Sequence, residues 1–257
     1  MPMDPRLLRP RASGAFSPAS ISGLAAWFDS TDNSTISTDT GVTAWVDKIN
    51  GYTLSQDTGA NQPTISSING VQAFDYNGST QFLSSTDAGL VAEGEGASEV
   101  NPTTVFYVAE FDAFVHHFPV NWSNSTTSGG TSPIYGTVNI LSGAGEWRIF
   151  YRPGGLLVNN QTAETASTNT PYILSTTTGE DIAIFANGSE LLSAENTASE
   201  SPLDADSFSV GVLVRTTNNF HVDGKIGDVL VYNRVLTDAE REKVEQYLAT
   251  KYGITLA

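Results

Sequence analysis

The chain has 257 residues, with 28 acidic side chains against 12 basic ones and a formal net charge of −16. It contains no cysteine, which excludes disulfide scaffolds, thiolate zinc sites, iron–sulfur clusters and cysteine nucleophiles. The acidic balance argues against nucleic-acid binding, and no apolar run approaches the ~18 residues of a membrane span, so we expect no nucleic-acid partner and no membrane insertion.

Residues 1–18 form a basic arm on an acidic chain. Three arginines stand there beside a single acid, and four prolines disfavour helix and strand. The arm lacks the apolar core of a secretory signal. It is either a frayed terminus or a docking arm that pairs with carboxylates of a partner and buries its apolar side chains there. The residues expected to dock are Arg6, Leu7, Leu8, Arg9, Arg11 and Phe16.

A short helix or turn is expected at residues 21–28, and beyond it the chain has many turn signals. Four Asn-Gly steps suit type I′ turns between antiparallel strands, namely Asn50-Gly51, Asn69-Gly70, Asn77-Gly78 and Asn187-Gly188. Short apolar or alternating runs lie between them, from residue 71 to residue 232. Ten or more short strands at this spacing predict an all-β sandwich or barrel.

One segment near the C-terminus has a helical pattern. Thr237 and Glu240 match the capping box T-x-x-E, and apolar residues then recur three and four positions apart. This pattern predicts a single helix over residues 238–250.

Four segments together point to a known family. They are residues 21–29 (ISGLAAWFD), 73–83 (AFDYNGSTQFL), 184–188 (IFANG) and 227–240 (GDVLVYNRVLTDAE). This set resembles the laminin-G/concanavalin A-like domains of phage and marine bacterial proteins. The resemblance implies one jelly-roll sandwich of two antiparallel sheets over residues 19–257. Residues 111–136 match no part of the pattern, and we interpret them as an inserted loop.

Some proteins that this chain resembles are glucanases, whose chemistry needs a pair of carboxylates. The nearest match to their catalytic strand is residues 93–99 (EGEGASE), whose small spacers favour a loop over a rigid strand. The sequence also lacks H-E-x-x-H, G-x-S-x-G and the phosphate-binding P-loop motif. We therefore expect no catalytic residues.

A calcium site is a second candidate. Laminin-G and lectin relatives often bind one calcium ion at the sandwich rim, and Asp29 and Asp32 offer hard oxygen donors near the start of the domain. The alternative is that these side chains bond their own turn backbone, as Asp often does.

The segment 111–136 combines aromatic rings with amides, which is the usual composition of a sugar site. A long aromatic loop in a compact domain is often functional, although its rings can also pack the loop onto the sandwich. The candidate ligand-binding residues are His116, His117, Asn121, Trp122 and Tyr135.

These observations favour a non-enzymatic phage virion protein in capsid decoration, a fibre or the tail. It would display a lectin-like module on the virion surface. The arm would dock it to other virion proteins or to copies of itself, and the module would bind a cell-surface glycan. The alternatives are a bacterial extracellular carbohydrate-binding module and, with less support, a glycoside hydrolase.

Overall fold

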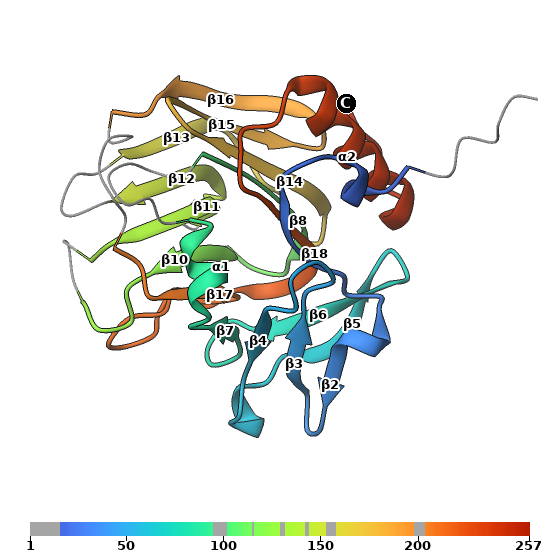
Figure 1. Ribbon diagram of the computed structural model, residues 1–257, viewed down its shortest axis with the longest axis vertical. Coiled ribbons are helices and arrows are strands. Elements are labelled where there is room, and N and C mark those ends of the chain that lie inside the picture. Colours follow the sequence, from blue (N-terminus) through green and yellow to red (C-terminus); the bar gives the residue numbers. More distant parts are fainter. Residues whose placement is uncertain are drawn as a thin grey trace, which may run out of the picture.

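The computed structural model describes residues 16–94, 102–114, 116–128, 132–141, 144–152, 158–197 and 204–257, and these consist mainly of strands (Figure 1). The strands are β1 (Leu24–Phe28), β2 (Ile36–Thr38), β3 (Val42–Val46), β4 (Thr53–Ser55), β5 (Thr64–Ile68), β6 (Val71–Asn77), β7 (Leu83–Ser85), β8 (Thr103–Phe111), β9 (His116–His117), β10 (Val120–Ser123), β11 (Ile134–Leu141), β12 (Glu146–Arg152), β13 (Val158–Thr165), β14 (Pro171–Thr178), β15 (Asp181–Ala186), β16 (Ser189–Glu195), β17 (Ser207–Val210) and β18 (Asp223–Tyr232). The helices are α1 (Ala88–Ala92) and α2 (Asp238–Tyr252), with 3-10 turns at η2 (Pro18–Ser20), η3 (Asn33–Thr35) and η4 (Gly59–Asn61).

Within the described residues, the strands form two antiparallel sheets. Sheet A has the strand order β16-β15-β14-β8-β18-β6-β5, and β1 also pairs with β18. Sheet B has the order β13-β12-β11-β10-β17-β7-β4-β3-β2, and β9 also pairs with β11. The main hydrophobic core draws its side chains from both sheets, so the sheets pack face to face. The predicted β-sandwich is confirmed.

Sheet A is apolar on both of its faces. In β8, Val105 and Tyr107 belong to the core between the sheets, whereas Phe106 and Val108 belong to a second cluster beneath α2. This follows from the two-residue period of a strand. Helix α2 therefore covers the outer face of sheet A as a third layer (Figure 1).

Helix α2 begins at the predicted position and extends slightly beyond the predicted end. The backbone N–H and the hydroxyl of Thr237 both donate to Glu240 Oε2 at 3.0 Å, within a capping box. Val244 and Leu248 are fully buried against sheet A. The helix is thus fixed by its local start signal and by an apolar stripe.

Two of the four Asn-Gly steps form the predicted turn with positive φ at both residues. Asn69 and Gly70, between β5 and β6, have φ of 50° and 81°, and Asn187 and Gly188, between β15 and β16, have φ of 49° and 87°. At the other two steps only the glycine has a positive φ. The hairpin expected to turn at Asn187-Gly188 is therefore confirmed.

Two expectations about local structure are wrong. Residues 21–28 contain strand β1 instead of a helix, because their apolar side chains pair the segment with β18 at the far end of the chain. Residues 111–136 are not an inserted loop, since β10 pairs with both β11 and β17 inside sheet B.

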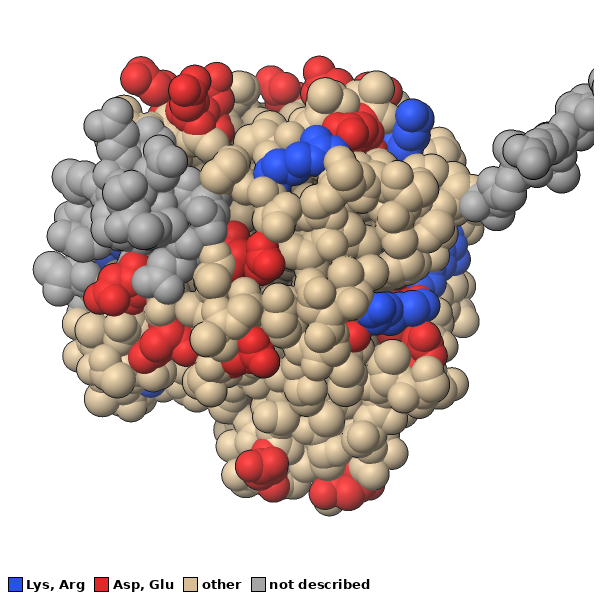
Figure 2. Space-filling model, viewed as in Figure 1, with Lys and Arg blue, Asp and Glu red and all other residues tan. Residues whose placement is uncertain are grey.

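The surface reflects the composition of the chain. Acidic side chains are spread over the face of the molecule in Figure 2, and basic side chains gather in a few places. Among the described residues, no helix combines the length and the apolar character that crossing a bilayer requires.

Candidate functional site

The outer face of sheet B carries an unusual set of side chains. Trp122, Tyr151 and Phe208 point into the core between the sheets. Their strand neighbours alternate to the opposite face, where Phe150 and Arg152 of β12 therefore lie. A sheet with one face in the core commonly presents a polar face to water, but here part of that second face is aromatic and basic.

A small hydrophobic cluster covers this outer face. Phe118, Ile134 and Leu213 are buried in it, and Phe150 and Phe220 pack against it while half-buried. The Phe118 ring lies 5.9 Å from the Phe150 ring and 5.5 Å from the Phe220 ring. We call these five residues the outer aromatic cluster.

Two arginines lie against this cluster. The guanidinium of Arg152 is 5.3 Å from the Phe150 ring centre, and that of Arg215 is 6.0 Å from the Phe220 ring centre. Burial lowers the pKa of both, and the nearby charge of Arg152 helps to lower the pKa of Arg215 to about 10. Because an arginine side chain keeps its proton in proteins, both groups carry their charge here at a cost in desolvation and mutual repulsion.

Arg215 has few compensating partners. Within the part of the chain that the structure describes, it forms no salt bridge, and its Nε is buried without a hydrogen-bond acceptor. A buried cationic donor without an acceptor is unfavourable, and an anion bound beside it would relieve that cost.

A pocket of about 430 Å³ adjoins the outer aromatic cluster at Phe220. Its lining residues are Gly78, Ser79, His116, Asn218, Asn219, Phe220 and His221. The exposed His116 ring lies 5.3 Å from the Phe220 ring. The volume is in the usual range of small-molecule sites, and the lining combines rings with amide and hydroxyl groups, as sugar sites do.

The predicted ligand-binding residues divide into two groups. His116 lies in the pocket and is exposed. The four residues that are fully buried are His117, Asn121, Trp122 and Tyr135. The hypothesis that these four face a ligand directly is wrong, because Trp122 and Tyr135 belong to the core between the sheets and none of the four has exposed surface.

Two of these buried residues, His117 and Asn121, bond to the segment that carries Arg215 and most of the pocket residues. The ring nitrogens of His117 lie 2.7 Å from the Ala113 carbonyl oxygen and 3.0 Å from the His221 carbonyl oxygen. Burial lowers the pKa of His117, which favours the neutral ring. The Asn121 amide donates to the Val212 carbonyl at 2.8 Å, at the start of the segment that carries Arg215.

The predicted calcium ligands already contact ammonium groups. The Lys48 Nζ lies 3.0 Å from Asp29 Oδ2 and 3.3 Å from Asp32 Oδ2, and the Lys251 Nζ lies 2.7 Å from Asp29 Oδ1. Burial alone would raise the pKa of Asp29, but Lys251 lowers it well below the ordinary value. Among the described residues, no three His, Asp or Glu side chains gather as a metal site. These residues do not fit a calcium ion.

Most of the predicted docking arm lies outside the described residues, including Arg6, Leu7, Leu8, Arg9 and Arg11. Phe16 is described, and 36% of its surface is exposed. Its ring meets that of Tyr247 on α2 edge-on at 6.3 Å, so the chain enters the sandwich beside this helix.

Solved structures with a similar fold include domains that occur in carbohydrate-active proteins. The CBM40 domain of a Ruminococcus gnavus sialidase, bound to α2,3-sialyllactose, matches with a TM-score of 0.53 and 16% identity over 72% of this chain and 96% of the domain. Domain 4 of a Geobacillus stearothermophilus arabinanase, in complex with arabinotriose, matches with a TM-score of 0.56 and 14% identity over 84% and 95%. The shared feature is the β-sandwich fold.

A Trypanosoma rangeli sialidase in complex with sialic acid also matches, with a TM-score of 0.62 and 14% identity over 90% of this chain. The chain spans only 34% of that enzyme's length. No family model and no curated protein sequence matches.

Sequence reasoning missed Arg152, Arg215 and Phe220. A signal was present, because arginine is rare in the acidic body of this chain and Arg152 ends the alternating segment 146–152. The sequence does not show that the segment with Leu213 and Phe220, some sixty positions later, folds over strand β12.

Proposed function

We propose that this chain is a non-catalytic glycan-binding module that holds an acidic sugar on the outer face of sheet B, at the pocket beside Phe220. One observation carries the proposal. In a chain with a net charge of −16, Arg152 and Arg215 lie together against the outer aromatic cluster, and Arg215 has no carboxylate partner among the described residues.

Each part of the pocket has a role in this proposal. Phe220 and His116 offer rings to the C–H face of a pyranose, and Asn218 supplies an amide for hydroxyl groups. Arg215 does not line the pocket but lies against the Phe220 ring that does, and from there it would offer a planar donor pair to a sugar carboxylate, while the nearby Arg152 adds positive potential. One of the two similar domains is bound to sialyllactose, an acidic sugar, and the other to arabinotriose, a neutral one, so binding of both kinds of sugar should be measured.

The residues that line the pocket do not suit hydrolysis. A glycosidase of the common type needs two carboxylates about 5–10 Å apart around the scissile bond. The lining of this pocket contains no Asp or Glu. A pocket lined by rings, amides and a hydroxyl group but by no carboxylate supports binding rather than bond cleavage.

Isothermal titration with 3′-sialyllactose and with lactose tests the proposal. We expect binding of the sialylated sugar only, and a loss of about 10–100-fold in affinity for Arg215→Gln, because a charge-assisted contact is removed. Lys243→Gln removes one positive charge from α2, on the opposite side of the sandwich, and should bind like the wild-type chain. Equal binding of both sugars, or unchanged affinity in Arg215→Gln, would refute the acidic-sugar site.

We further propose that the module is displayed on a phage particle and docked there by residues 1–18. The support is the basic arm on an acidic body, and the entry of that arm at Phe16 beside α2. Phe16 contacts α2, which covers the outer face of sheet A, whereas Phe220 of the pocket packs in the cluster on sheet B. A bacterial extracellular carbohydrate-binding module remains the alternative.

A particle-assembly assay distinguishes these two settings. The chain lacking residues 1–18 should still bind the glycan but should be absent from purified particles. Full incorporation of the truncated chain would show that the arm does not dock it.

A further inference from the structure

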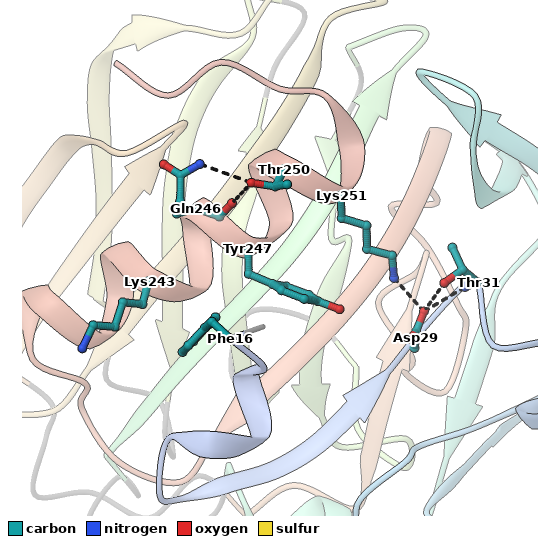
Figure 3. A pocket seen from close by; sticks show the side chains of 8 residues that line it. All are labelled: Phe16, Asp29, Thr31, Lys243, Gln246, Tyr247, Thr250 and Lys251. Atoms are coloured by element: carbon teal, nitrogen blue, oxygen red, sulfur yellow. Dashed lines mark hydrogen bonds and ion pairs between the residues drawn. The ribbon is translucent and has the colours of Figure 1, made fainter. Parts of the chain in front are cut away.

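The end of α2 meets sheet A at a pair of buried carboxylates. Asp228 lies in β18 and is fully buried, and Asp29 directly follows β1 and is 5% exposed. Lys251, in the last turn of α2, reaches down between them, and Figure 3 shows its bond to Asp29. We call Asp29, Asp228 and Lys251 the rim triad.

The ammonium group of Lys251 is fully coordinated. Its Nζ lies 2.7 Å from Asp29 Oδ1, 2.7 Å from Asp228 Oδ2 and 2.9 Å from Asp228 Oδ1. An ammonium group has three donors, and three carboxylate oxygens surround it here. This arrangement resembles a cation in a binding site more than a surface ion pair.

Asp228 depends on this cation. Its oxygens also accept from Trp27 Nε1 at 3.1 Å, the Tyr252 hydroxyl at 2.8 Å and the Ser30 backbone N–H at 3.2 Å. These three donors are neutral. Among the described residues, the positive charge that pairs with Asp228 comes from Lys251. A buried carboxylate without a compensating charge is strongly unfavourable, so the ammonium is essential at this position.

A divalent ion would compete for the same position. Calcium takes six to eight oxygen ligands at about 2.3–2.6 Å, and the oxygens of Asp29 and Asp228 converge on the Lys251 Nζ. The remaining Asp29 oxygen pairs with Lys48, at 3.0 Å. A calcium ion could bind between the two carboxylates only if Lys251 left.

We infer that Lys251 is the resident cation of this rim and takes the place of a metal ion, so the module folds without divalent cations. The cation is covalently part of α2. It cannot be removed by a chelator, and it joins the helix to the end of β1 and to the middle of β18. The rim and the helix therefore form together.

Thermal unfolding of the wild-type chain tests the inference without any substitution. The midpoint should agree to within about 1 °C in EDTA, in CaCl₂ and in MgCl₂ of equal ionic strength. A rise of more than about 3 °C that is specific to calcium and reversed by EDTA would overturn the inference.

Charge removal tests the role of Lys251 itself. Lys251→Met should lower the midpoint by roughly 6–20 °C, because Asp228 is left buried and uncompensated. The double variant Lys251→Met with Asp228→Asn should recover most of this loss. The control Lys48→Met, at a position with a 31% exposed side chain, should lower the midpoint far less. An unchanged midpoint in Lys251→Met, or no recovery in the double variant, would overturn the assignment.

Discussion

Replacement of Trp122 by alanine should destabilise the protein strongly and leave its glycan affinity intact. The side chain is fully buried, stacks on Tyr135 at 5.2 Å and meets Phe208 edge-on at 4.7 Å. A buried tryptophan removes ~150–250 Å² from water, which at ~25 cal/mol per Å² is about 4–6 kcal/mol, and alanine retains part of it. Its Nε1 also donates to the Leu90 carbonyl at 3.1 Å, and that acceptor would lose its partner.

The expected cost of Trp122→Ala is therefore about 3–5 kcal/mol, or a fall of roughly 6–20 °C in the unfolding midpoint of a chain of this size. Differential scanning calorimetry measures the midpoint, and titration well below it measures affinity per folded molecule. Trp122→Phe is the matched control, because it keeps an aromatic ring, loses the bond to Leu90 and should cost less. A midpoint within about 2 °C of the wild-type value, together with lost glycan binding, would show that Trp122 faces the ligand and that the assignment to the core is wrong.

Three further predictions concern stability. Burial lowers the pKa of His117, so the unfolded chain takes up a proton there before the folded chain does as the pH falls. The contribution of His117 to stability should therefore be complete above pH ~6.5 and should decline below it. Denaturant titrations at several pH values measure this, and the profile of His117→Gln should be flatter. Gly224→Ala should lower the unfolding midpoint by several degrees, because a Cβ there would lie 2.3 Å from the Glu110 carbonyl oxygen at a φ of 142°; normal stability would contradict this strand pairing. Thr237→Ala should cost about 0.5–2 kcal/mol in the free energy of unfolding by loss of the α2 cap, and no change would mean that Glu240 alone holds the start of the helix.

Features that depend on neighbouring residues were predictable from the sequence. The T-x-x-E pattern placed the start of α2, and the Asn-Gly steps at residues 69 and 187 specified two hairpins. These signals act over a few residues, so tertiary contacts had little to override.

Features that depend on distant partners were missed. Strand β1 pairs with β18 across some two hundred residues, and its short apolar run suits a helix equally well in isolation. Strand β10 reads as a loop because Asn121 and Ser123 alternate with Trp122, yet both faces of this strand are buried and the polar side chains lie beneath a covering segment. Where both faces of a strand are covered, the polarity pattern no longer separates inside from outside.

The pairing of β1 with β18 and the packing of α2 on sheet A together determine how the module responds to a pulling force. Leu24, at the start of β1, lies opposite Tyr232, at the end of β18, but the chain continues past Tyr232 into α2, whose Val244 and Leu248 are buried against sheet A. Tension applied between the two ends therefore has to detach α2 from sheet A before it reaches the ladder of β1 and β18, which then opens one residue pair at a time. The contacts of α2 with sheet A, including the bonds of Lys251 to Asp29 and Asp228, are therefore the first mechanical barrier when the module is pulled by its two ends.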